Sequence, residues 1–386
     1  MKSFLTTLVL CIAFSSSAVS AADFSDAELV ELGQAYALAV NELDVGAFDR
    51  LISARHLAQN VAEIAGDSEA EKEELFRQFE KTIPTINERM MVEFERQQAW
   101  AVFLRVHEFD GMRGPLVRYS VGEGYNYVLL LPVRPARAAR GAQIGDLFYA
   151  TTGELLSESL GIATKLVSSP SETFLGKLFG TKVANDELVR AFKQVGELRQ
   201  QNRLREAYDV LDQVQGGARN HRLILANTIQ IAAQLDEDLY RAELKRLATY
   251  HKDDPRAAFT LLDHYFLEND LDSAMAVVDL MEQTYGQDAV FFIFRANVDA
   301  ARGRFDTAAN YAEKAVQMEP GNEDAYWTML TLLVQSEKFA EGVEIVQLLE
   351  NEFGYFFMRE DFEAEPLYAD FARSAEFARW IEAPGR

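Results

Sequence analysis

The sequence predicts an α+β N-terminal domain, with helices packed on a curved antiparallel sheet, followed by an all-α solenoid of helical repeats. Two observations predict this division. In the second half a pattern of apolar and small residues returns every 34 residues. In the first half the apolar period changes from that of helices to that of strands. A length of 386 residues is enough for two such domains.

The first segment, residues 1–22, has the anatomy of a secretory signal peptide. Lys2 supplies a positive start, Phe4 to Phe14 is an apolar run, and small residues follow as a cleavage site. The run is shorter than the roughly 20 apolar residues that span a bilayer, and no later segment reaches that length. Cys11, the single cysteine, lies in this leader, so the mature chain is expected to have no thiol. We therefore expect a periplasmic or secreted bacterial protein.

The chain is strongly acidic, with 61 Asp and Glu against 38 Lys and Arg and a net charge of −23. Removal of the leader takes away Lys2 and no acid. Such a charge is expected to repel nucleic acid and anionic membrane surfaces and to attract a basic partner. The alternative interpretation is that the acidity keeps a secreted protein soluble.

The first half, residues 23–165, begins with helical patterns. Apolar residues at three- and four-residue spacing predict a helix over 24–53. A second helix is expected from Ser68, a plausible N-cap, and Pro84 is expected to kink or break it before it resumes to about Arg96.

Alternating apolar residues then indicate strands. Four strands are expected, at residues 100–106, 116–121, 125–133 and 143–150. A short helix is predicted over 153–160, where Gly161 is placed to end it. Helices followed by meandering strands are typical of an α+β domain.

The stretch from Asp146 to Glu154, which follows a Tyr-rich strand and a basic hairpin, resembles the last strand of cone-shaped nuclear transport factor two-like domains. The resemblance covers about residues 24–165. It implies a curved sheet that wraps around the helices and leaves a pocket at the mouth of the cone. The hairpin arginines Arg134, Arg137 and Arg140 suit an anion or an acidic partner surface, or form a solvated loop.

Four residues are candidates to line this pocket: Tyr125, Tyr127, Asp146 and Tyr149. A hydroxyl and a carboxylate in an apolar cavity are suited to proton transfer. The pocket is therefore a candidate site for a small hydrophobic ligand, or for isomerase- or dehydratase-like chemistry. The alternative is structural, with Asp146 only pairing with Arg118 or Arg105.

After a linker at 166–184, residues 185–354 are expected to form about five helix pairs, and 355–386 a capping helix. One column of the repeat holds a small residue in the second helix of each pair, where a neighbouring helix is expected to pack closely. Its members are Ala207, Ala242, Ala274, Ala308 and Gly342.

The second half resembles the tetratricopeptide repeat family. The unit closest to the family pattern carries Phe292, Ala296, Gly303, Phe305, Ala308, Ala312, Ala315 and Pro320. The resemblance implies that the first helix of each pair lines a concave groove that binds a protein or peptide. The groove positions are then Phe259, Asp263, Phe266, Ile293, Asn297, Trp327 and Thr331. The alternative is that the aromatic members are core residues between units.

Motifs for catalysis or cofactor binding are not found in the sequence. The histidines are scattered without metal-ligand spacing, and no Gly-rich phosphate loop or Gly-x-Ser-x-Gly elbow occurs. We therefore expect no cofactor and no metal. The sequence predicts a non-catalytic interaction scaffold, with ligand binding or catalysis in the N-terminal pocket as the alternatives.

Overall fold

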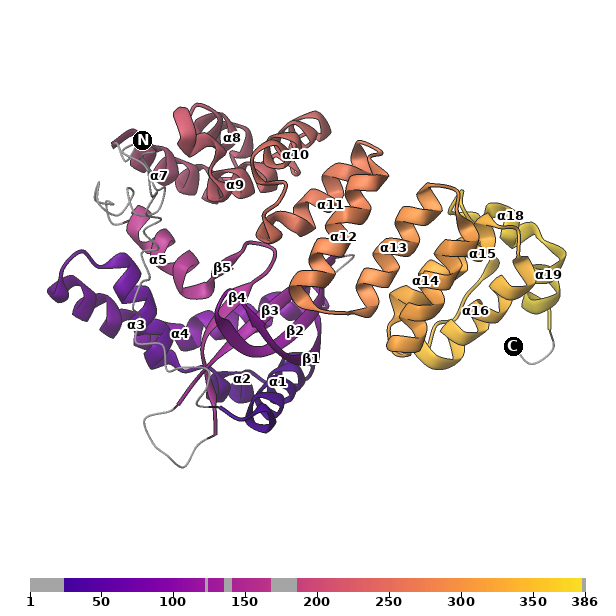
Figure 1. The fold of residues 1–386 in the computed structure, drawn as a ribbon, viewed down its shortest axis with the longest axis horizontal. Helices are drawn as coiled ribbons and strands as arrows, with labels where there is room; N and C mark the ends of the chain where they lie inside the picture. The colour runs from indigo at the N-terminus through magenta and orange to yellow at the C-terminus, as the bar shows by residue number, and fades with distance from the viewer. Residues whose placement is uncertain (1–23, 122–123, 135–140, 168–185, 384–386) are drawn as a thin grey trace, which may run out of the picture. The chain divides into compact units, whose positions relative to one another are not determined.

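A computed structural model describes residues 24–121, 124–134, 141–167 and 186–383 (Figure 1). The chain divides into two compact units, residues 1–194 and 195–386, called unit 1 and unit 2 below. The predicted leader and most of the predicted linker lie outside the described residues. No helix in the described part of the chain has both the length and the apolar character needed to cross a bilayer.

Unit 1 starts with four helices: α1 (Asp26–Asn41), α2 (Val45–Leu51), α3 (Ala54–Ala65) and α4 (Glu69–Arg96). The single helix expected over 24–53 is therefore wrong. The chain turns between α1 and α2, where Leu43 adopts a positive φ of 52° that a right-handed helix cannot contain. The predicted cap of α4 is present, because the Ser68 hydroxyl accepts a hydrogen bond from the Glu71 amide at 3.2 Å.

Pro84 does not break α4, which continues through it to Arg96. The expectation of a break was wrong because packing outweighs the missing amide hydrogen bond. Phe79, Ile83 and Met91 on the same helix are buried in the core, while Pro84 is exposed. The apolar stripe therefore holds both halves of the helix against the core.

The sheet is an antiparallel meander in the order β1-β2-β3-β4-β5. Its strands are β1 (Trp100–Phe109), β2 (Met112–Val121), β3 (Gly124–Val133), β4 (Gln143–Tyr149) and β5 (Glu154–Leu155). The helix expected over 153–160 starts later, because β5 pairs with β4, and α5 spans Leu156–Val167. Gly161 does not end α5. A Cβ there would lie 2.7 Å from Cγ2 of Ile64, so glycine permits close approach to α3.

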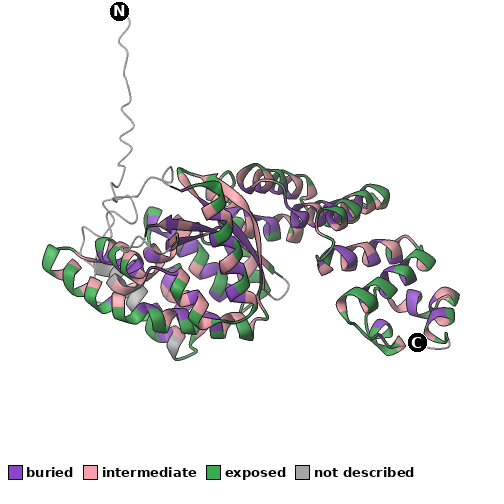
Figure 2. Ribbon diagram, turned by 90° about the horizontal axis from the view of Figure 1, so that it is seen from below, coloured by how far each residue is buried: buried purple, intermediate pink, exposed green. Residues whose placement is uncertain are grey.

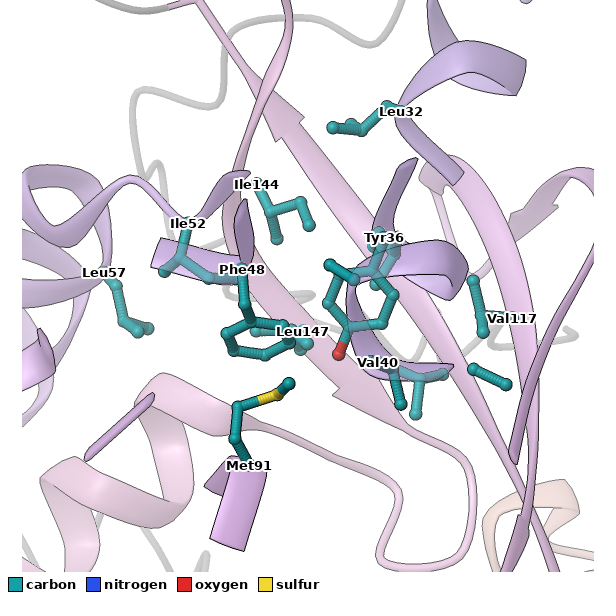
Figure 3. Packing of buried hydrophobic residues seen from close by; sticks show 14 of the residues in the cluster. Leu32, Tyr36, Val40, Phe48, Ile52, Leu57, Met91, Val117, Ile144 and Leu147 are labelled. Atoms are coloured by element: carbon teal, nitrogen blue, oxygen red, sulfur yellow. The ribbon is translucent and has the colours of Figure 1, made fainter. Parts of the chain in front are cut away.

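The core of unit 1 lies between α1–α4 and one face of the sheet (Figure 3). Tyr36 and Phe48 have ring centroids 5.3 Å apart, and Phe94 stacks on Tyr119 at 5.2 Å. The Tyr119 hydroxyl donates to the Tyr36 hydroxyl, so these buried polar groups satisfy each other. The predicted α+β class is confirmed as an antiparallel five-stranded sheet with helices packed on it.

Unit 2 is a run of helices. It follows α7 (Asp186–Gln200), which crosses the boundary between the two units, and begins with α8 (Leu204–Asp212). The packed pairs after α8 are α9 (Arg222–Ala232) with α10 (Glu237–His251), α11 (Ala258–Leu267) with α12 (Leu271–Tyr285), α13 (Ala289–Ala301) with α14 (Phe305–Met318), and α15 (Glu323–Gln335) with α16 (Phe339–Phe353). Two 3₁₀ turns, η2 (Gly216–Asn220) and η3 (Pro255–Ala257), lie before α9 and α11. Along these helices buried and exposed residues alternate (Figure 2), as expected for amphipathic packing.

The small-residue column is buried at Ala207, Ala274, Ala308 and Gly342. Ala242 is the exception, because it is exposed and the next residue, Glu243, takes the buried position on α10. The irregular spacing of 35 and 32 residues around Ala242 is the only trace of this shift in the sequence.

The capping segment is not one helix. Three short helices form it: α17 (Arg359–Glu363), α18 (Ala369–Arg373) and α19 (Ala375–Ile381). Pro366 after α17 and the N-cap Ser374 before α19 divide the segment. Phe371 is buried, and a Cβ on Gly342 would lie 3.1 Å from its Cε2 atom. Because Gly342 has no side chain, Phe371 of the C-terminal segment can pack closely against α16 at this position.

Candidate partner-binding surface

The predicted groove positions behave differently in successive pairs. Asp263 on α11 and Asn297 on α13, which lie 34 residues apart, are both exposed. The Asp263 carboxylate accepts a hydrogen bond from the Tyr240 hydroxyl at 2.9 Å, which joins α11 to α10. The polar members of the column therefore lie on the surface in two pairs.

Ile293 is a core residue, and its prediction as an exposed groove position was wrong. Only 4% of it is exposed, and it packs with Ala289, Ala315 and Ala325. These small side chains let α13, α14 and α15 approach closely enough to enclose Ile293.

The two phenylalanines of α11 are half-buried. The Phe259 ring lies 6.1 Å from that of Tyr285, on α12, so it contributes to packing within the pair. Phe266 lies near the end of the same helix. The alternative interpretation, that the aromatic groove residues pack against neighbouring helices, thus describes Phe259.

In the last pair the C-terminal segment covers the predicted groove residues. The Trp327 ring is 5.7 Å from both Tyr355 and Phe357, and its Nε1 atom donates to Glu323 at 2.9 Å. The Thr331 hydroxyl lies 2.7 Å from the Tyr368 hydroxyl. Trp327 and Thr331 are therefore engaged by residues of their own chain.

This arrangement creates a surface that the sequence interpretation missed, here called the aromatic ledge: Trp327 together with residues 355–358. Tyr355 and Phe357 are stacked with centroids 5.0 Å apart and planes 6° apart. Between them Phe356 is 73% exposed, and Met358 is 53% exposed. The run Tyr355-Phe356-Phe357, at the start of the predicted capping helix, is the signal in the sequence for this surface.

The ledge is held by carboxylates. Glu323 accepts hydrogen bonds from Trp327 and from the Tyr355 hydroxyl, and the Phe357 amide donates to Glu350 at 3.0 Å. The pKa of Tyr355 is raised, first by burial and then by the hydrogen bond with Glu323. A fixed backbone thus presents exposed apolar side chains beside negative charge, as is common at protein-binding surfaces.

The proposed pocket residues of unit 1 lie on different sides of the sheet. Tyr149 pairs in register with Val128, which belongs to the core facing the helices. Tyr127 is adjacent to Val128 on β3, so its side chain points to the opposite face, as does that of Tyr125. The four residues therefore cannot line a single cavity, which corrects the expected constellation.

Asp146 is a structural carboxylate in this arrangement. It is 2% exposed, and it accepts hydrogen bonds from the Leu147 amide at 2.9 Å, the Ser157 amide at 3.1 Å and the Asn60 side chain at 3.1 Å. Burial raises its pKa to about 6, against the lowering effect of these hydrogen bonds. Because Ser157 belongs to the first turn of α5, Asp146 fixes the start of that helix.

A hollow in the described part of unit 1 lies elsewhere. It has a volume of about 370 Å³ and lies among α1, α2 and the start of β4, with Leu32, Arg50 and Ala142 in its lining. Glu28 at its edge forms an ion pair with Arg134, which also lies 4.2 Å from the Phe24 ring centroid. Arg134 is thus neutralised, and the other two hairpin arginines lie outside the described residues.

Comparison with known proteins identifies part of unit 2. Residues 299–353 match the tetratricopeptide repeat family. No curated protein matches the chain significantly. Among solved structures, one titled "Crystal structure of MamA protein" matches with a TM-score of 0.36 and 14% identity, covering 45% of this chain and 98% of that one. The helices from α13 to α16 thus contain a tetratricopeptide repeat sequence.

Proposed function

We propose that this protein is a non-catalytic scaffold that binds a protein partner through unit 2. The proposal is supported by the family match at 299–353, because tetratricopeptide repeats generally bind proteins or peptides. It is also supported by the aromatic ledge, whose exposed Phe356 and Met358 are large apolar side chains on a backbone fixed by hydrogen bonds. Such side chains are typical anchors of a binding interface.

The partner segment should be apolar and basic. The ledge offers aromatic and thioether surface, and the carboxylates of Glu323 and Glu350 lie beside it. The chain as a whole carries a net charge of −23, which attracts a cationic segment over distances up to about 10 Å at moderate salt. A helix or strand with leucine and lysine side chains has both properties.

The test uses the full chain and two synthetic amphipathic peptides of equal apolar content, one with lysines and one with glutamates. Fluorescence anisotropy should show binding of the lysine peptide, weakening with salt, and at least about tenfold weaker binding of the glutamate peptide. Phe356→Ser together with Met358→Ser should reduce the affinity for the lysine peptide by about tenfold or more. Leu38→Ser, at an exposed apolar position of unit 1, is the matched control.

Equal affinity for both peptides would overturn the charge argument. Equal affinity of the wild-type and ledge variants, with thermal unfolding unchanged, would remove the ledge from the proposal.

We also propose that the mature chain acts in the periplasm or outside a bacterial cell. The proposal is supported by the charged start, apolar run and small residues of segment 1–22. Amino-terminal sequencing of the protein from fractionated cells should find a chain that begins near Asp23. An intact Met1 in the cytoplasmic fraction would contradict it.

A further inference from the structure

The α9–α10 pair of unit 2 departs from the small-residue column. Glu243 replaces the small buried residue, and Ala242 lies exposed beside a hollow of about 520 Å³. The hollow, called the basic hollow here, lies between the end of α8, η2 and one side of α10. Its lining includes Asp212, Arg219, Lys245, Arg246, Thr249 and Tyr250.

A buried arginine forms part of the lining. Arg219 is 4% exposed, and its Nη2 atom donates to Asp212 at 3.1 Å and to Glu243 at 2.5 Å. Glu243 in turn accepts from the Tyr208 hydroxyl at 2.9 Å and from Thr228 at 3.1 Å. This network fixes the guanidinium in place from the protein side.

The other side of the same guanidinium lacks acceptors. Its Nε and Nη1 atoms are buried and have no hydrogen-bond partner among the described residues. A buried polar group without a partner destabilises the folded state. Arg219 is also one of the residues that line the hollow.

Two further cations lie along the same hollow. Lys245 is exposed and Arg246 is half-buried, and in the described part of the chain neither is in an ion pair. Asp212 is the only acid in the lining and already accepts from Arg219. In a chain where acids outnumber bases by 61 to 38, this local excess of positive charge is unusual.

We infer that the basic hollow binds a small oxyanion, a phosphate or carboxylate group, with Lys245 and Arg246 as direct contacts. Charge-assisted hydrogen bonds from lysine and arginine are the usual means of holding such groups. Tyr250, which is 57% exposed, offers a ring to an organic substituent on the anion. This site is formed by α8–α10 and does not depend on the aromatic ledge.

Isothermal titration calorimetry of the full chain with inorganic phosphate and with succinate tests the inference. At least one of these anions should bind saturably with a stoichiometry near one. Lys245→Gln together with Arg246→Gln should weaken the affinity for that anion by about tenfold or more. The matched control, Arg373→Gln with Arg379→Gln, removes the same charge from exposed positions of the C-terminal segment and should leave the affinity unchanged.

Phenyl phosphate distinguishes a free inorganic anion from an organic one. If Tyr250 contributes, phenyl phosphate binds more tightly than inorganic phosphate, and Tyr250→Ala removes that advantage alone. Failure of both anions to bind saturably, or equal affinity in the Lys245/Arg246 variant, would overturn the inference. Both substituted side chains are accessible from the surface, so loss of folding should not obscure the result.

Discussion

The Tyr368 hydroxyl lies 2.7 Å from the Thr331 hydroxyl, which joins the C-terminal segment to the helix expected to line a groove. With Trp327 against Tyr355 and Phe357, this contact means that the chain's own end fills the last position of the predicted column. At this pair the predicted groove residues are therefore covered, and the aromatic ledge lies on the outer side of that segment.

The contact between Thr331 and Tyr368 should contribute modestly to stability. Thr331→Val and Tyr368→Phe should each lower the free energy of unfolding by about 0.5–1.5 kcal/mol, because each removes one hydrogen bond. The double variant should lose less than the sum of the two, since both changes remove the same interaction. Urea unfolding of the four proteins measures the coupling, and strict additivity would show that the two hydroxyls do not interact.

Ala308 should not tolerate a large side chain. It is fully buried and packs with Ala296, Ala312 and Leu332. Ala308→Leu should lower the free energy of unfolding by about 1–3 kcal/mol through overpacking. The neighbouring exposed position provides the control, since Thr307→Leu should change stability by no more than about 0.5 kcal/mol. Equal melting temperatures for the two variants would contradict the packing of this column.

The pKa of Asp146 should make stability depend on pH. Burial raises this pKa to about 6 in the folded protein, above the value of about 3.9 in an unfolded chain. Between these values the folded state binds more protons than the unfolded state, so this group's contribution falls as the pH rises from about 4 to about 6. Asp146→Asn should flatten that part of the profile of unfolding free energy against pH.

The size of the change in unfolding free energy with pH tests the titration of Asp146. A shift of about two pKa units corresponds to roughly 3 kcal/mol between the two ends of the window. Urea unfolding of wild type and Asp146→Asn at both ends measures it. If the unfolding free energies of wild type and Asp146→Asn differ by the same amount at both pH values, Asp146 does not titrate in this range.

Replacing one partner of the buried ion pair between Arg219 and Glu243 should destabilise the protein strongly. Replacing both with apolar residues should cost much less free energy of unfolding. Glu243→Gln leaves the buried guanidinium without its strongest partner and should cost about 3–5 kcal/mol. Replacing both, with Arg219→Met and Glu243→Leu, should be far less costly because no buried charge remains. Thermal unfolding compares them, and a double variant less stable than Glu243→Gln would contradict this account of the pair.

Pro84 should lower the stability of α4. It is exposed within the helix and cannot donate an amide hydrogen bond to Glu80, one turn earlier. Pro84→Ala should therefore raise the free energy of unfolding by about 1–3 kcal/mol. Denaturant titration measures the gain, and a loss of stability would show that the core requires a bend at this position.

The sequence by itself determined that helices precede an antiparallel set of strands in unit 1 and that the helices of unit 2 recur as a repeat. Period and spacing are local properties, so the columns through Ala274 and Ala308 were readable without a structure. Even Ser68 was identified as a cap, because capping depends on neighbours three residues away.

Only the tertiary structure decided which of these side chains remain accessible. Ile293 lies in the column of Trp327, yet the packing of α13 against α14 and α15 encloses it. Tyr127 and Tyr149 point to opposite faces of one sheet. Glu243 is buried because it forms a hydrogen bond with Arg219, which lies on η2. Burial depends on contacts between segments far apart in the chain, and the local sequence pattern around a residue does not specify those contacts.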